Sequence, residues 1–152
     1  MLHYPNGDLF STGVTACEIE PLNREQGDNN RIILMVEVDG ALTRAVLDTG
    51  GIYCILHPAA ADDIQFDTSQ SLGPYKINIR GFPYKGSLYR STLRINAEQG
   101  DSLEQDVTVF VPEATAEEWG ELPTFLGLTG CLERLRFAVD PSQDKFYFGA
   151  LP

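Results

Sequence analysis

Short apolar runs separated by turn residues recur along the chain, a pattern typical of β-strands. Residues 31–38 and 41–48 form two such runs on either side of Asp39-Gly40, a pair that favours a tight hairpin turn. A further strand is predicted over residues 104–112, and segment 136–149 predicts two strands paired around the turn PSQD. These runs indicate a mainly β protein.

Three more strands are predicted over residues 13–20, 75–80 and 87–96, where apolar and polar positions alternate. The polar segment 21–30 is expected to be a long loop between strands. Glycines at both ends of GFPYKG (81–86) and a proline near its middle favour a loop or a mobile hairpin tip.

Helical structure is expected only in short pieces. The segment HPAAADD (57–63) favours a helical turn. Thr115 is followed three residues later by Glu118, the spacing of a helix capping box. After an apolar strand that breaks at Gly127, residues 128–135 are predicted to continue as a helix.

Short strands separated by turns favour a closed or folded-over barrel over βαβ units. The fold class is therefore expected to be all-β in the main, with one or two short helices. The 152 residues suit one domain with a real core. We expect residues 1–30 to be an N-terminal extension containing the polar loop, and residues 31–149 to form the core of this single domain.

Charge limits the range of partners. The chain has 22 acidic and 11 basic residues and a formal net charge of -11, which argues against nucleic acid or an anionic membrane as its main partner. No apolar run approaches membrane-spanning length, and the first ten residues lack the basic and apolar regions of a signal peptide. Cys17, Cys54 and Cys131 are widely spaced and suit small buried residues of a reduced compartment. We therefore expect a cytoplasmic protein.

Several kinds of chemistry find no support. No two cysteines have metal-ligand spacing, and His3 and His57 lie far apart in the sequence, so a metal site or a His/Cys catalytic pair has little support. The chain has no glycine-rich loop ending in Lys-Ser or Lys-Thr and no Gly-x-Ser-x-Gly elbow. No metal or organic cofactor is expected.

The segment AVLDTGGIYCIL (45–56) contains the most informative feature. It ends an apolar strand at Asp48, continues through Thr49, Gly50 and Gly51, and then becomes apolar again. A carboxylate in such surroundings is costly unless another group pairs with it or uses it. A plain alternative is that Asp48 caps its own turn, as aspartate commonly does.

Three features, in this order, resemble the retropepsin-like aspartic proteases, the single-lobed relatives of pepsin. They are the strand and loop AVLDTGG, the glycine-punctuated hairpin INIRGFPYKGSLYR, and Phe125-Leu126-Gly127 followed by LTGCLERL and RFAVDP. The resemblance spans roughly residues 31–149 and implies a single-lobed acid-protease barrel. It departs from the family at Gly51, where alanine or serine is usual.

The resemblance implies an aspartic endopeptidase that is active as a homodimer on an extended peptide or protein. Two carboxylates about 3 Å apart would share one proton, and one chain supplies only one of them, Asp48. Thr49, Gly50 and Gly51 would support the active-site loop, and the Thr49 hydroxyl would bond across to the partner loop. Activity is then expected at mildly acidic pH, because one carboxyl must be protonated and the other ionised.

The same resemblance assigns two further sets of residues. The flap over the substrate would contain Gly81, Phe82, Pro83, Tyr84 and Gly86. The element packed under the active-site loop would be Phe125, Leu126 and Gly127. The aromatic strand KFYFG near the end of the sequence would either help to build a dimer sheet or complete the barrel of its own chain.

Two alternatives stay open. A retropepsin-like fold can act as a dimerisation or peptide-binding module with little or no proteolysis, because a fold does not fix a function. A small β-barrel in which Asp48 merely caps a turn is the other.

Overall fold

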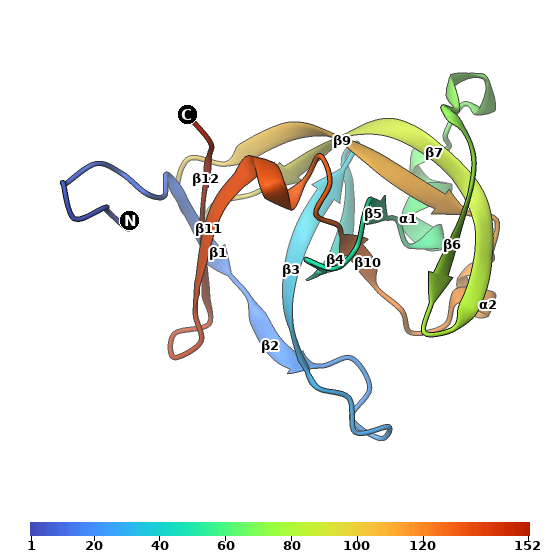
Figure 1. Cartoon of the computed structure of the whole chain (residues 1–152), viewed down its shortest axis with the longest axis horizontal. Helices are drawn as coiled ribbons and strands as arrows, with labels where there is room; N and C mark the ends of the chain where they lie inside the picture. Colours follow the sequence, from blue (N-terminus) through green and yellow to red (C-terminus); the bar gives the residue numbers. More distant parts are fainter.

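The computed structural model describes all residues, 1–152, and shows two β-sheets folded around one main core (Figure 1). The larger sheet has eight strands, in the spatial order β2 (Glu18–Pro21), β3 (Asn30–Val38), β4 (Ala41–Leu47), β10 (Thr124–Leu126), β5 (Cys54–Ile55), β9 (Leu103–Pro112), β7 (Phe82–Ile95) and β6 (Gly73–Ile79). An additional pairing of β3 with β7 closes this sheet on itself. The predicted mainly β, folded-over barrel is therefore confirmed.

The smaller sheet has four strands, in the order β11 (Leu135–Asp140), β12 (Lys145–Ala150), β1 (Gly13–Ala16) and β8 (Gln99–Gly100). Strand β12 contains the aromatic segment KFYFG and pairs with β11 on one side and β1 on the other. Both of its edges are thus used within the chain, and β12 completes a sheet of its own chain. Strands β1 and β2 lie in the segment expected to be an N-terminal extension, and they pair with β12 and β3.

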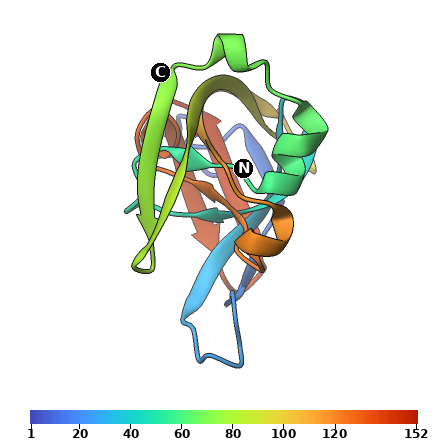
Figure 2. The ribbon, with the colours of Figure 1, turned by 90° about the vertical axis from the view of Figure 1, so that its right-hand side faces the viewer.

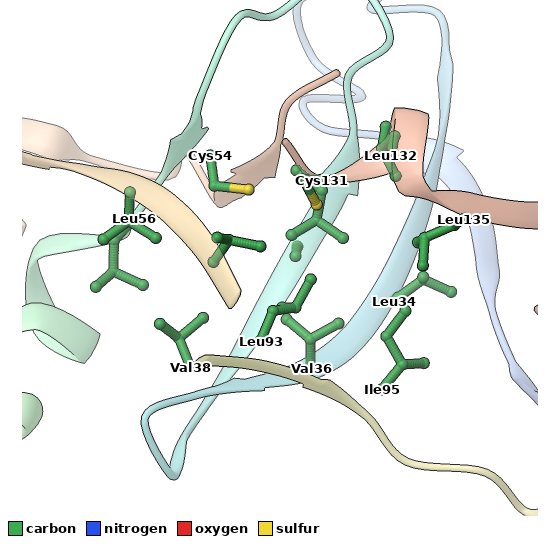
Figure 3. Packing of buried hydrophobic residues seen from close by; sticks show 14 of the residues in the cluster. Leu34, Val36, Val38, Cys54, Leu56, Leu93, Ile95, Cys131, Leu132 and Leu135 are labelled. Atoms are coloured by element: carbon green, nitrogen blue, oxygen red, sulfur yellow. The ribbon is translucent and has the colours of Figure 1, made fainter. Parts of the chain in front are cut away.

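A cluster of 21 buried residues fills the space between the sheets, as Figure 3 shows for part of it. Leucine and valine side chains from β3 and β7 meet there with the side chains of Cys54 and Cys131 (Figure 3). A second, smaller cluster joins Ile33, Val46, Trp119 and Phe125. This second cluster lies beside the loop that contains Asp48, because Val46 and Phe125 belong to the two strands that hold it.

The hairpin β3–β4 follows the prediction closely. Asp39 and Gly40 both have positive φ, 45° and 84°, as a tight two-residue turn of this kind requires. The turn is anchored because the Asp39 carboxylate accepts a hydrogen bond from the Thr92 N–H at 2.8 Å. The hairpin thereby fixes the register of β4, which leads directly into Asp48.

Two short helices are present, as predicted. Helix α1 (Pro58–Ile64) begins after His57, whose Nδ1 accepts a hydrogen bond from the Ala59 N–H. Helix α2 (Ala116–Trp119) has the predicted capping box: the Glu118 N–H donates to the Thr115 hydroxyl at 3.2 Å, and the Thr115 N–H donates to the Glu118 carboxylate at 2.8 Å. Short 3-10 turns occur at Thr68–Gln70 (η1) and Leu132–Arg134 (η2). No helix has the length and apolar character needed to cross a bilayer.

The predicted helix over residues 128–135 is wrong. Only the 3-10 turn η2 forms there, and it is preceded by Gly130 with a φ of 69°. The backbone N–H groups of Leu128 and Thr129 donate to the carbonyls of Gly51 and Ile52. These contacts fix the start of the segment to a loop far earlier in the sequence. The N–H groups of Leu132 and Glu133 then donate to carbonyls five residues back rather than four, so no regular α-helix forms.

The prediction of a loop over residues 81–86 is also wrong in extent. Strand β7 begins at Phe82 and pairs with β6 up to Ile79, so that only Arg80 and Gly81 form the turn. Both have positive φ, 51° and 84°, which allows a two-residue hairpin turn. In Figure 2 this hairpin runs along one side of the molecule, and its tip points downwards, as does the loop between β2 and β3.

Candidate active site

Asp48 lies immediately after β4, at the point where β10 runs parallel to β4. Its N–H donates to the Leu126 carbonyl at 2.9 Å, so the backbone of Asp48 is fixed to β10. Its carboxylate oxygen Oδ1 accepts a hydrogen bond from the Gly50 N–H at 3.1 Å. The carboxylate is partly exposed and keeps most of its acceptor capacity free for another group.

The glycines of the loop make room for this carboxylate. A β-carbon on Gly51 would come within 2.9 Å of the Asp48 Oδ2 atom, closer than side chains normally approach. The Gly51 N–H donates to the Asp48 carbonyl at 3.0 Å, which closes a tight turn. Gly51 therefore gives the Asp48 side chain the space that it occupies here.

The segment after β10 packs against the far side of the same loop. The Leu128 N–H donates to the Gly51 carbonyl at 2.7 Å, and the Thr129 N–H donates to the Ile52 carbonyl at 2.8 Å. A β-carbon on Gly127 would overlap the carbonyl group of Tyr53, so only glycine allows this approach. The loop that contains Asp48 is thus held by backbone contacts at both ends.

A cavity of about 520 Å³ opens beside Asp48. Eleven of its eighteen lining residues are hydrophobic, and its volume lies in the usual range of ligand-binding clefts. Its walls come from the Asp48 loop, from strand β6 and from Phe110 and Phe125. A polar carboxylate beside a mainly apolar cavity is an arrangement that suits binding of a partly apolar molecule next to a reactive group.

Only some of the residues assigned from the sequence lie on this cavity. Asp48, Gly50, Gly51 and Phe125 line it. The residues that do not are Thr49, Leu126, Gly127, Gly81, Phe82, Pro83, Tyr84 and Gly86. Thr49 is exposed, and Leu126 and Gly127 are buried.

The β6–β7 hairpin lines the cavity with its first strand, β6, rather than with its second strand, β7. Residues Tyr75 to Arg80 line the cavity, whereas Phe82 is 68% exposed. Tyr84 turns to Trp119 of α2, with ring centroids 4.9 Å apart in an edge-to-face arrangement. The alternation of apolar and polar residues over 75–80 was the available signal, because it marks one strand face as inward. The flap was instead predicted in the neighbouring segment 81–86, which has glycines at both ends.

The cysteines are not placed to act as nucleophiles. All three are free and buried. A hydrogen bond with Cys54, together with burial, raises the pKa of the Cys131 thiol, which favours the neutral form. Among the described residues, which are the whole chain, no group of three His, Cys, Asp or Glu side chains is arranged to hold a metal ion.

Comparison with known proteins gives structural matches only. No family model matches the sequence, and no curated protein matches it. The structure is similar to that of a retropepsin-like aspartic protease from Rickettsia conorii, with a TM-score of 0.55 and 20% identity over 91% of this chain and 95% of that one.

Two further solved structures are similar at lower scores. They are the retroviral protease-like domain of Ddi1 from Leishmania major (TM-score 0.45, 14% identity, 80% of this chain and 94% of that one) and EIAV protease in complex with the inhibitor HBY-793 (TM-score 0.42, 17% identity, 64% and 81%). Of these three structures, the Rickettsia protein has the highest TM-score and matches nearly the whole length of both chains. This chain has the single-lobed fold of the retropepsin-like aspartic proteases.

Proposed function

We propose that this protein is an aspartic endopeptidase that works as a homodimer, with Asp48 of each protomer forming the catalytic pair. The observation that supports this most is the position of Asp48, on a loop fixed by backbone hydrogen bonds and beside a largely apolar cavity. In a retropepsin-like fold, an Asp-Thr-Gly sequence at this point is the arrangement on which peptide hydrolysis by two carboxylates depends.

A second protomer supplies what one chain lacks. One chain has a single Asp-Thr-Gly, so the partner carboxylate comes from another copy across a two-fold axis. Thr49 is exposed, so its hydroxyl can bond to the partner loop. The Asp48 carboxylate retains free acceptor positions for a water molecule and for the shared proton.

The reaction follows from one protonated and one ionised carboxyl. The ionised carboxylate takes a proton from water as the water oxygen bonds to the scissile carbonyl carbon, and the protonated carboxyl gives its proton to the carbonyl oxygen. In the next step the amide nitrogen accepts a proton from the carboxyl that acted as base, and the C–N bond breaks. One hydroxyl of the tetrahedral intermediate returns its proton to the other carboxylate, which restores the pair and leaves an acid and an amine.

The substrate is expected to bind as an extended strand. Strand β6 is the last strand of the eight-stranded sheet, so one row of its backbone N–H and C=O groups has no partner strand. An extended peptide can pair with such an edge through its own backbone, while side chains enter the adjacent cavity. Tyr75, Ile77 and Ile79, all half-buried on one face of β6, provide apolar contacts.

The hydrogen bond from the Gly50 N–H to Asp48 also suits the turn-capping alternative, in which the carboxylate has only a structural role. Cleavage of an unstructured peptide library separates the two. Wild type is compared with Asp48→Asn, which keeps the size of the side chain, and with Asp62→Asn, a control on the exposed face of α1. The assays run from roughly pH 4 to 7, the range set by a carboxyl pair.

We expect wild type and Asp62→Asn to cleave the same peptides, and Asp48→Asn to cleave none. Sedimentation of each variant at several concentrations reports whether the dimer forms. Cleavage that survives in Asp48→Asn, or no cleavage by wild type at any pH while it is dimeric, overturns the proposal.

A further inference from the structure

The charges around the cavity are opposite to those of the whole chain. The protein has a formal net charge of -11, yet the charged residues that line the cavity are three cations, Arg31, Lys76 and Arg80, and one anion, Asp48. These three are a substantial part of the eleven basic residues in the chain. A local concentration of positive charge in an acidic protein raises the local concentration of anionic groups.

Arg31 is the cation best placed to act inside the cavity. It lies on β3 on the same face as Ile33, because the two residues are two positions apart on one strand. Ile33 packs against Val46 and Phe125, both of which line the cavity. The Arg31 side chain is half-buried, so its charge is only partly screened by water.

Within its own chain, Arg31 has no carboxylate partner. Glu20 lies directly opposite it in the β2–β3 register, but Arg44 contacts one Glu20 oxygen and Arg24 contacts the other, at 3.3 Å. The Arg31 guanidinium donates only to the backbone carbonyls of Asn29 and Asn30, at 3.5 and 3.3 Å, which are long contacts. Most of its five N–H donors are therefore available to another group.

The other two cations are arranged differently. Arg80, at the tip of the hairpin, is paired with Asp28 at 2.9 Å, so its charge is already neutralised locally. Lys76 also borders the cavity, but it alternates with the half-buried Tyr75 and Ile77 along β6 and is itself exposed. Arg31 is thus the one cavity-lining cation that is both partly buried and without a carboxylate partner in its own chain.

We propose that Arg31 makes this site selective for peptides that have an acidic side chain close to the scissile bond, beside a large apolar side chain that fills the cavity. This inference rests on the proposed peptidase function. A glutamate or aspartate in the substrate matches the planar guanidinium with two parallel hydrogen bonds, a geometry that a neutral amide cannot reproduce. The apolar majority of the lining then accommodates the neighbouring side chain.

The experiment measures kcat/KM for peptide pairs that differ only by Glu against Gln, with the exchange moved through each position near the scissile bond. Wild type is expected to favour the Glu peptide at one position by about ten- to hundredfold, the usual effect of a hydrogen-bonded charge pair. In Arg31→Gln, the ratio of kcat/KM for the Glu peptide to that for the Gln peptide is expected to fall to near one. Arg31→Glu is expected to favour a Lys peptide. Added salt should reduce the wild-type ratio.

Arg90→Gln is the matched control. Arg90 is an exposed cation of β7 that donates to the Thr108 hydroxyl and does not line the cavity. The Glu/Gln ratio of kcat/KM in Arg90→Gln is expected to equal that of wild type. Arg31→Lys, which keeps the charge but not the planar fork, is expected to give an intermediate ratio and serves if Arg31→Gln does not fold.

The outcomes separate this inference from the function on which it rests. No cleavage of any peptide overturns both. Cleavage by wild type with a Glu/Gln ratio near one at every position overturns the selectivity and leaves the peptidase standing. A preference for the Glu peptide that persists in Arg31→Gln also overturns the role of Arg31. So does an Arg31→Gln variant that no longer dimerises and loses kcat/KM equally on the Glu and Gln peptides.

Discussion

Gly127 lies so close to Tyr53 that a β-carbon on the glycine would overlap the Tyr53 carbonyl group. This approach brings the segment after β10 against the loop that contains Asp48, and the hydrogen bonds of Leu128 and Thr129 then hold the two together. The position of Asp48 therefore depends on the absence of a side chain at a residue far away in the sequence.

Gly127→Ala tests this dependence. The added methyl group must push the two segments apart, so we expect a loss of about 1–3 kcal/mol in the free energy of unfolding, the usual cost of overpacking. Urea unfolding followed by tryptophan fluorescence measures it. Gly27→Asn is the control, because Gly27 has a φ of 69° with open space around it and asparagine tolerates that conformation. An equal loss in both variants would contradict the explanation by crowding.

Thr124 links β10 to two other elements. Its hydroxyl lies 2.8 Å from the Thr43 hydroxyl of β4 and accepts a hydrogen bond from the His57 N–H at 3.0 Å. Thr124→Val keeps the shape but leaves the His57 N–H and the buried Thr43 hydroxyl without a partner, which costs about 1–3 kcal/mol. Thr43→Val, made alone and together with Thr124→Val, completes a double-mutant cycle, and a coupling energy of zero would show that the two hydroxyls do not interact.

His57 makes the start of α1 sensitive to pH. Burial lowers the pKa of His57 below its usual 6.5, and Nδ1 must be unprotonated to accept the Ala59 N–H. The unfolded chain then binds this proton more readily, so the contribution of the cap is full above about pH 6.5 and is lost as the pH falls below that value. The loss is at most about 1 kcal/mol, the usual value of a helix cap.

His57→Asn supplies the same cap from an amide that does not titrate. Chemical unfolding of wild type and His57→Asn between pH 8 and 5, about 1.5 units on either side of the usual histidine pKa, should show a difference that changes with pH. Hydrogen bonds from Ser142 and Ser69 lower the pKa values of Asp140 and Asp67 below 3.8, so their contributions are lost only at more acid pH. Parallel pH curves for the two proteins would contradict the prediction.

The ion pair between Arg80 and Asp28 connects the tip of the β6–β7 hairpin to the loop between β2 and β3. Asp28→Asn removes this connection, and Asp28 is not itself among the residues that line the cavity. We expect amide hydrogen exchange in β6 to become about two- to fivefold faster, which corresponds to the 0.5–1 kcal/mol of a surface pair. Glu104→Gln, which breaks the pair with Arg94 elsewhere on β7, should leave exchange at the hairpin tip unchanged.

The parts of the site that local patterns determine were predictable. Asp39-Gly40 sets the β3–β4 turn, that turn fixes the register of β4, and β4 ends at Asp48 as expected. The capping box of α2 was found for the same reason, since its donors and acceptors lie within four residues.

The parts that depend on distant contacts were missed. Residues 128–135 have an apolar pattern that favours a helix, but Leu128 and Thr129 are tied to the Asp48 loop and the hydrogen bonds that follow are not those of a regular α-helix. The glycines of 81–86 favour a loop, yet pairing with β6 keeps Phe82 to Gly86 in a strand and leaves only Arg80 and Gly81 to turn. Arg31 was not singled out, because a lone arginine on a strand becomes notable only when its neighbours in space are known.

The parallel pairing of β10 with β4 also has a consequence for biosynthesis. Leu126, Gly127 and Leu128 fix the Asp48 loop, although Asp48 itself is made much earlier. On the ribosome, a nascent chain has to extend beyond residue 128 before its carboxylate loop can be assembled. Any hydrolytic capacity of this loop is thereby withheld until translation of the barrel is nearly finished.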